Sequence, residues 1–168
     1  MMCGITGTPG TGKSKVSEEL ALRGHTVVHI TDTVAPYVSG NDVERDARII
    51  DVDRWAAEFV PVDGFVEGHI AHLLPCDRIV VLRCRPDVLK NRLSSRNYRE
   101  EKILENSDAE ALDVCLIETV EEFKPYQILE LDTTVHDIPY CADRIERFVK
   151  GDIPSGFGTI DWTAFLEV

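Results

Sequence analysis

The eight residues Gly7-Thr8-Pro9-Gly10-Thr11-Gly12-Lys13-Ser14 decide how the rest of the chain is interpreted. They match the pattern GxxxxGK[ST] at every fixed position, between an apolar run that ends at Thr6 and a helical pattern that begins at Lys13. Glycines let the backbone curl until successive N–H groups face inward, and the helix N-terminus adds partial positive charge beneath bound phosphates. The stretch therefore predicts a nucleoside triphosphate site, whose expected binding residues are Gly7, Gly10, Thr11, Gly12, Lys13, Ser14 and Lys15.

Two side chains of this loop have specific expected roles. The Lys13 ammonium group is long enough to reach the β and γ phosphates, and the Ser14 hydroxyl is expected to ligate Mg²⁺. The dinucleotide-binding pattern GxGxxG does not occur, and neither do the NKxD and DxxG strings of a GTPase. The sequence therefore favours a small phosphotransferase over either of those classes.

Short apolar runs alternate with helical patterns along the whole chain. The runs cover residues 1–6, 26–30, 64–68, 78–83 and 128–132, and most of them lack polar alternation, which is typical of strands buried in a parallel sheet. Helices are predicted over 13–23, 52–59, 86–96 and 142–150. A further long helix is predicted to end before Pro125, with one apolar stripe made of Leu104, Leu112, Leu116, Val120 and Phe123. For 168 residues this pattern predicts one α/β domain built as a three-layer sandwich.

Three segments depart from the alternation. Residues 32–51 and 94–103 are polar and charged, and both are predicted to be surface flaps. The tail after Gly151 ends in Trp162, Phe165 and Leu166, and aromatic residues so near a chain end favour packing back onto the domain.

The net charge of the chain limits the classes of partner that it is expected to bind. It contains 30 Asp and Glu against 18 Lys and Arg, a net charge of -12. This excess repels nucleic acids and anionic membranes and attracts a basic protein, although solvation in a salty cytoplasm also explains it. Without a long apolar run or a signal peptide, a cytoplasmic location is expected. The five scattered cysteines contain no CxxC pair, which predicts buried, reduced thiols.

Two groups of residues outside the loop are candidates for the chemistry. Arg92 and Arg96 are spaced i, i+4, so both guanidinium groups share one helix face and supply charge for a transferring phosphoryl group. Glu67-Gly68-His69 ends the third apolar run, where a carboxylate can organise Mg²⁺ and His69 can orient a water or a phosphate. The catalytic candidates are Lys13, Arg92, Arg96, Glu67 and His69, and the metal candidates are Ser14 and Glu67. The spacing ExHxxH is not a zinc pattern, so His72 is predicted to be structural.

Taken together, these residues resemble a known family. The GTPGTGKS loop, the acid-x-His after the third run, VLR after the fourth and the segment from Arg92 to Tyr98 are similar to adenylate kinases of the archaeal and eukaryotic nuclear type, isoenzyme six in the vertebrate series. The resemblance covers about residues 3–150. It implies a P-loop nucleoside monophosphate kinase fold with a mostly parallel five-stranded sheet in a domain of residues 1–150. The lid would lie at about 95–105 and the monophosphate-binding flap at about 30–51, with 151–168 as a tail.

The resemblance also implies an activity. The expected reaction is ATP plus AMP to two ADP, or the same transfer to a broader range of nucleoside monophosphates, with Mg²⁺ accompanying ATP. Arg92 and Arg96 are expected to close onto the transferring phosphoryl group, and Arg96 is also an expected ATP-binding residue. The alternative is an ATPase that assists late maturation of the small ribosomal subunit through a basic ribosomal protein. A small-metabolite kinase shares the loop but not the RLxxRxY and E-x-H combination.

The sequence departs from the family pattern at three points. Glu67 stands where Asp is common, and Asn97 replaces the usual Gly before Tyr98, which Asn tolerates because it enters left-handed conformations easily. An expected Arg or Lys shortly after Asp32 is absent. The monophosphate is therefore expected to bind among Asp32, Arg45, Arg48 and Arg54.

Overall fold

A five-stranded sheet forms the centre of the protein in the computed structural model, which describes residues 1–42 and 47–166. The strand order is β2-β5-β1-β6-β7, and every neighbouring pair is parallel. The strands are β1 (Met2–Thr6), β2 (Val27–His29), β5 (Gly64–Glu67), β6 (Arg78–Arg83) and β7 (Ile128–Asp132). Because all strands run in one direction, their carboxyl ends meet at a single edge, which is where ligands of open α/β sheets bind. The predicted α/β fold class is confirmed.

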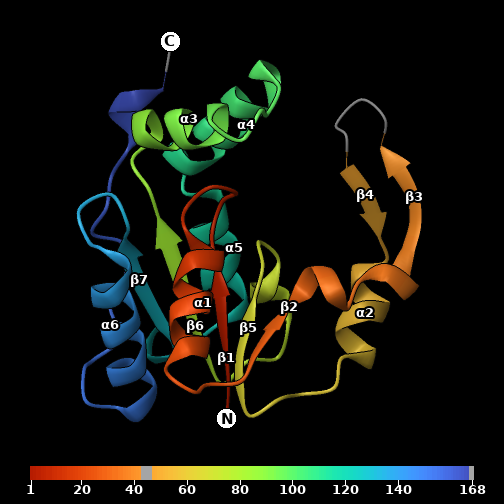
Figure 1. Cartoon of the computed structure of the whole chain (residues 1–168), viewed down its shortest axis with the longest axis vertical. Coiled ribbons are helices and arrows are strands. Elements are labelled where there is room, and N and C mark those ends of the chain that lie inside the picture. Colours follow the sequence, from red (N-terminus) through yellow and green to blue (C-terminus); the bar gives the residue numbers. More distant parts are fainter. Residues whose placement is uncertain (43–46, 167–168) are drawn as a thin grey trace.

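Helices cover both faces of this sheet, as the side chains of β6 show. Val80 and Leu82 point to a core shared with α1 (Lys13–Leu22) and α6 (Ile138–Lys150). Ile79 and Val81 point to the opposite core, shared with α5 (Val114–Glu122) and α2 (Val52–Glu58). This alternation follows from the two-residue period of a strand. Figure 1 shows α1 and α6 on the near face and α5 behind the sheet.

A small hairpin stands out from the sheet beyond β2. It consists of β3 (Val38–Asp42) and β4 (Ala47–Ile50), which pair antiparallel (Figure 1). Trp55 of α2 is fully buried at its base, where the indole Nε1 donates to Thr33 Oγ1 at 3.0 Å. The polar stretch 32–51 was predicted only as a surface flap. It contains a β-hairpin whose base packs on the buried Trp55. Short 3₁₀ turns complete the connections: η1 (Ile30–Asp32), η2 (Ala35–Tyr37), η3 (Ala71–Leu73), η4 (Pro125–Gln127) and η5 (Thr163–Phe165).

The second polar stretch joins α3 (Pro86–Ser94) to α4 (Glu100–Ala111) above the carboxyl edge (Figure 1). A separate small core holds the two helices together, made of Cys84, Leu89, Leu93 and Ile103. Asn97 turns the chain between them with φ 58°, the left-handed conformation that the Gly-to-Asn departure requires.

The prediction of one long helix that ends before Pro125 is wrong. The chain forms two helices instead, because Asp113 adopts φ 57° between them and its carboxylate bonds the buried Arg83. The first helix, α4, packs against α3, whereas α5 packs against β6. The five apolar residues therefore do not form one buried stripe. Leu104 and Leu112 are exposed to 41% and 51%, whereas Leu116 and Phe123 are buried, and Val120 is also exposed.

The C-terminal segment lies against the domain. Gly156 pairs with the edge of β7, since Glu130 N donates to Gly156 O at 2.8 Å and Gly156 N donates to Ile128 O at 3.1 Å. Farther along, η5 contacts α4, and the rings of Trp162 and Phe165 meet edge to face. The last helix begins at Ile138, earlier than predicted, with Asp137 as its N-cap. In the part of the chain that is described, no helix has both the length and the apolar character needed to cross a membrane.

Candidate active site

The loop between β1 and α1 has the shape that its glycines predict. Gly7 has φ 142°, and a Cβ atom there would lie 2.4 Å from the carbonyl oxygen of Leu82, so no other residue fits without displacing β6. Gly12 caps α1 with φ 102°, which turns the loop into the helix. Gly10 and Thr11 are buried between these points. The backbone is therefore curled over the N-terminus of α1, the arrangement that binds phosphate.

Lys13 is folded back over this loop. Its side chain is only 8% exposed, and Nζ donates to Gly7 O at 2.8 Å and to Thr8 O at 3.0 Å. Burial lowers the pKa of the ammonium group to about 8, and the carboxylate of Glu67 opposes that shift. The arrangement keeps a cation ready beside the loop, where phosphate oxygens can replace the two carbonyl groups.

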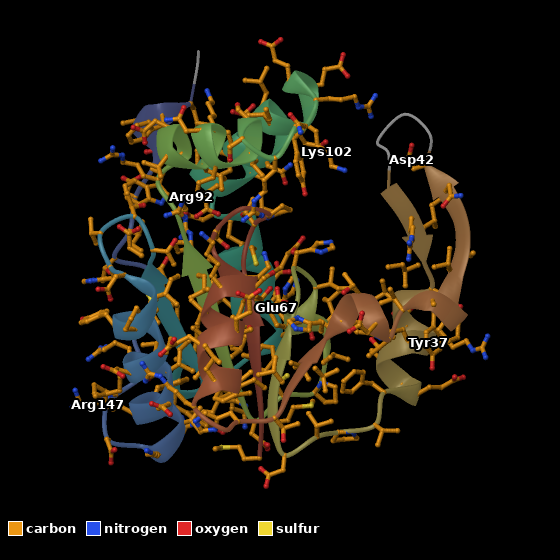
Figure 2. All side chains as sticks on the ribbon, in the orientation of Figure 1. Tyr37, Asp42, Glu67, Arg92, Lys102 and Arg147 are labelled. Carbon is orange, nitrogen blue, oxygen red and sulfur yellow. The ribbon has the colours of Figure 1, made fainter. Side chains whose placement is uncertain are left out.

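Glu67 ends β5 at the carboxyl edge, in register with Ile5 of β1 and His29 of β2. Its carboxylate is 7% exposed, and Oε2 lies 2.7 Å from Nδ1 of His29. Figure 2 shows Glu67 at the centre of the molecule, next to the upper end of α1. The histidine therefore orients a buried carboxylate toward the loop, an arrangement common around metal ligands.

The neighbouring polar residues divide into exposed and buried groups. Ser14 and Lys15 lie exposed on the first turn of α1, and the side chain of His69 is exposed after β5. His72 is buried instead, with Nδ1 2.9 Å from Thr6 Oγ1 and Nε2 3.1 Å from a carboxylate oxygen of Glu118. Burial lowers the pKa of His72, although Glu118 opposes the shift. These contacts support the structural interpretation of His72.

An open cavity of about 410 Å³ lies beside the loop, between the end of α3 and the segment that follows β7. Arg96 and Lys15 line it, and both residues are exposed. Figure 2 shows Arg92 directly above the loop. The remaining lining residues are Gly10, Gly12, Arg92, Ser95, Thr133, His136, Asp137 and Ile138.

Arg92 has protein partners in this structure. Its guanidinium group donates to Thr133 O at 2.9 Å, to Thr133 Oγ1 at 3.1 Å and to Gly10 O at 3.4 Å. The Thr133 hydroxyl also lies 2.7 Å from Thr11 O. Arg92 therefore joins the segment after β7 to the phosphate loop. The prediction that Arg92 and Arg96 share one helix face is wrong, because α3 ends at Ser94 and Arg96 lies in the turn beyond it.

The described candidates for a monophosphate site come from three different elements. Asp32 and Arg48 are exposed, on η1 and β4 respectively, and Arg45 lies outside the described residues. Arg54 is engaged elsewhere: Nε donates to Glu58 at 2.9 Å and the guanidinium carbon lies 5.6 Å from the centre of the Tyr37 ring. Figure 2 shows Tyr37 beside α2, across the molecule from Arg92.

The donor atoms at the loop suit magnesium. Ser14 offers a hydroxyl oxygen and Glu67 a carboxylate oxygen, the hard donors that Mg²⁺ prefers beside phosphate groups. Among residues 1–42 and 47–166, no cluster of three or more His, Cys, Asp or Glu side chains forms a separate metal site. The five cysteines are free thiols, four of them buried.

Sequence reasoning missed three residues near the loop. His29 was detectable in principle, because it is the polar residue that ends the strand next to β5. Thr133 and Glu110 had no local signal. Glu110 sits in an acidic helix and yet is 1% exposed, with its carboxylate 2.5 Å from Thr8 Oγ1.

Comparison with known proteins agrees with this geometry. The AAA domain family model matches residues 3–113. Proteins named "Putative adenylate kinase" from Archaeoglobus fulgidus and Natronomonas pharaonis are 41% and 40% identical, each over 99% of this chain and over 94% and 100% of their own lengths. The chain belongs to this adenylate kinase family.

Solved structures of lower identity support the fold of this adenylate kinase family member. A sugar kinase from Janibacter matches with a TM-score of 0.58 at 17% identity, over 89% of this chain and 94% of that one. A gluconokinase from Sinorhizobium meliloti matches with a TM-score of 0.56 at 16% identity, over 89% and 91%. At these identities the similarity shows a shared fold.

Proposed function

We propose that this protein transfers the terminal phosphoryl group of ATP to AMP and releases two ADP. The observation that carries the proposal is the phosphate loop with Lys13 folded into it, where Nζ lies 2.8 Å from Gly7 O while Glu67 ends the strand next to β1. Phosphoryl transfer needs positioning and charge stabilisation more than covalent chemistry, so cations and one carboxylate at a phosphate nest suffice. The name carried by the archaeal relatives supports the same activity.

ATP is expected to bind across the loop and the adjacent cavity. Its β and γ phosphates would occupy the nest over residues 7–12, where Lys13 exchanges its bonds to Gly7 and Thr8 for bonds to phosphate oxygens. The cavity of about 410 Å³ is large enough for the base and ribose. His136 lines that cavity and stacks on Tyr140 with ring centres 4.1 Å apart, which offers an aromatic surface beside the base.

Ser14 and Glu67 would hold Mg²⁺ beside the phosphates. When bound, the ion offsets the negative charge that the phosphate oxygens carry. The chain's own contribution is orientation, because His29 fixes Oε2 of Glu67 at 2.7 Å before any ligand arrives. His69, exposed after the same strand, would orient a water or a phosphate.

AMP is expected to dock under the hairpin of β3 and β4. The hairpin and the α3–α4 pair both project beyond the carboxyl edge of the sheet (Figure 1). We assign residues 30–51 as the monophosphate-binding flap and 95–105 as the lid that brings Arg96 onto the transferring group. Of the described basic candidates, Arg48 is the first choice for the AMP phosphate, since Arg54 is bound to Glu58.

The direct test is nucleotide turnover with and without an acceptor. Purified protein is incubated with Mg-ATP and, separately, AMP, CMP, UMP, GMP or a small sugar alcohol, and the nucleotide products are separated. We expect ADP formation that depends on AMP and runs in reverse from ADP. Transfer to a sugar alcohol but not to a monophosphate would contradict the proposal, as would ATP consumption that ignores AMP.

A second candidate is the ATPase that acts with a basic ribosomal protein of the small subunit. The observation that favours it is the surface of α4, α5 and the turn between them, which exposes the apolar residues Leu104, Leu112, Val114, Ile117 and Val120. Exposed acids accompany them on the same helices, namely Glu101, Glu105, Asp108, Glu118, Glu121 and Glu122. Apolar area mixed with negative charge is complementary to a basic partner.

Phosphate release without AMP distinguishes this candidate. If it is correct, ATP is hydrolysed to ADP and phosphate without an acceptor, faster when a purified basic ribosomal protein is added. Ile117→Asp should abolish that stimulation, whereas Val60→Asp, which alters a valine exposed to 77% after α2, should preserve it. Equal loss in both variants, or no stimulation in the native protein, would contradict it.

A further inference from the structure

A buried carboxylate lies directly under the phosphate loop. The hydroxyl of Thr8, the second residue of the loop, donates to Oε2 of Glu110 at 2.5 Å. Glu110 is 1% exposed and belongs to the last turns of α4, 102 residues away in sequence. The loop is thus bonded to the helix whose first turn belongs to the proposed lid.

The other oxygen of the same carboxylate is anchored to the sheet. Oε1 of Glu110 accepts from Nε of Arg83 at 2.8 Å and from the backbone N–H of Cys84 at 3.0 Å. Arg83 is itself fully buried, and it also bonds Glu130 at 2.6 Å and the carboxylate of Asp113. The position of Glu110 is therefore determined from two sides, because a buried carboxylate is stable only when it is paired and hydrogen-bonded.

Thr8 in turn determines the shape of the loop. Its carbonyl oxygen accepts from Lys13 Nζ at 3.0 Å, and also from the backbone N–H and the hydroxyl of Thr11 at 3.2 and 2.9 Å. A rotation of Thr8 would move the lysine and the inward N–H groups together. A bond from the Thr8 hydroxyl to a rigid acceptor prevents that rotation.

We propose that Glu110 is a positioning residue for nucleotide binding, which holds the phosphate loop in its receiving shape through Thr8 while Arg83 holds Glu110. The inference rests on the proposed function only in requiring that the loop bind a nucleotide. If Glu110 only stabilised the fold, the bonds of its Oε1 atom to Arg83 and Cys84 would be the ones that matter. The Thr8 side is therefore the part to test.

The experiment measures Mg-ATP binding by titration calorimetry without an acceptor, together with the melting temperature. Thr8→Val replaces the hydroxyl with a methyl group, and we expect the dissociation constant to rise roughly tenfold. The melting temperature should fall as well, because Oε2 of the buried Glu110 loses its partner. Thr8→Ser restores the hydroxyl and should recover most of the affinity. Glu110→Gln should weaken binding as well, since an amide NH2 facing Thr8 can only donate, so the hydroxyl must turn round to accept and the charge-assisted bond is lost.

The double variant and a matched control decide the mechanism. Thr8→Val combined with Glu110→Gln should bind no worse than Glu110→Gln alone, because the two residues act through one bond. Thr119→Val removes another fully buried hydroxyl, bonded to Cys115 O at 2.7 Å, and should keep native affinity. Unchanged affinity in Thr8→Val, or additive losses in the double variant, would overturn the inference. A native protein that does not bind Mg-ATP would overturn the proposed function first and this inference with it.

Discussion

The Nζ atom of Lys13 lies 2.8 Å from the carbonyl oxygen of Gly7, the first residue of its own loop. The backbone of the loop thus holds the lysine inside the phosphate nest. When a phosphate binds there, the lysine and the backbone hold it together. An ammonium group that must exchange only two carbonyl oxygens for phosphate oxygens needs little rearrangement, which is the advantage of a preorganised site.

Lys13→Ala should remove phosphoryl transfer and leave the fold in place. We expect the rate of ADP formation from ATP and AMP to fall by at least about 10²-fold, because a preorganised charge at the transferring group is lost. The circular dichroism spectrum should match the native one. Lys150→Ala, the same change in the last turn of α6, should keep full activity. Native rates in Lys13→Ala would show that the loop is not the site of the reaction.

His29→Ala should release the carboxylate of Glu67. Loss of the 2.7 Å contact leaves Oε2 without its orienting partner, so activity should fall roughly tenfold and the Mg²⁺ concentration for half-maximal rate should rise. His29→Asn, which retains a donor, should recover part of the loss. The comparison variant is His25→Ala, whose ring contacts Glu146 between α1 and α6. Equal effects of the two alanine variants would argue against a role for His29 in positioning.

Arg92→Ala and Arg96→Ala should separate stability from activity. Arg92 bonds Thr133 and Gly10, so its loss should cost about 1–2 kcal/mol of unfolding free energy in addition to activity. Arg96 lines the cavity, so Arg96→Ala should lower the rate about 10²-fold at an unchanged melting temperature. Urea titrations give the stability of each variant and parallel rate measurements give its activity. A loss of stability in Arg96→Ala but not in Arg92→Ala would contradict the roles assigned to the two residues.

The contact between His25 and Glu146 should make stability depend on acid pH. The hydrogen bond from His25, followed by that from Arg23, holds the pKa of the Glu146 carboxyl below its ordinary value of 4.5. A depressed pKa contributes stability that is complete above the unfolded value and is lost as pH falls through the folded one. Glu146→Gln should therefore lower the unfolding free energy at pH 7 by about 1 kcal/mol or less. The difference should shrink as pH falls below 4.5 and through the lowered pKa of Glu146. A difference that stays constant from pH 7 to pH 3 would refute this origin.

Asn97 should show the cost of its left-handed backbone. Asn97 has φ 58°, a conformation that alanine adopts at a cost and glycine adopts freely. Asn97→Ala is therefore expected to lower the unfolding free energy by about 1 kcal/mol, whereas Asn97→Gly should be neutral or slightly stabilising. Asn91→Ala, an exposed position inside α3, serves as the control and should not destabilise. Denaturant titration of the three variants provides the measurement. Equal losses in Asn97→Ala and Asn91→Ala would exclude backbone strain as the cause.

Local patterns identified most of the sheet and the loop. The strand runs were visible because strands buried on both faces are continuously apolar, as residues 79–82 are in β6. The break between α4 and α5 was not visible. It depends on the left-handed Asp113 and its bond to Arg83, a residue 30 positions earlier, and the polar patterns of both helices continue smoothly across it.

The sequence alone determined the phosphate loop, because each glycine and the lysine act through backbone geometry within eight consecutive residues. Tertiary structure alone decided the residues that support it. Thr133, after β7, and Glu110, on α4, bond the loop itself, whereas His29 of β2 bonds Glu67. They come together only because parallel strands end at one edge and a buried carboxylate must find partners across the fold. It also distinguished Arg92 from Arg96, which the i, i+4 spacing had treated alike.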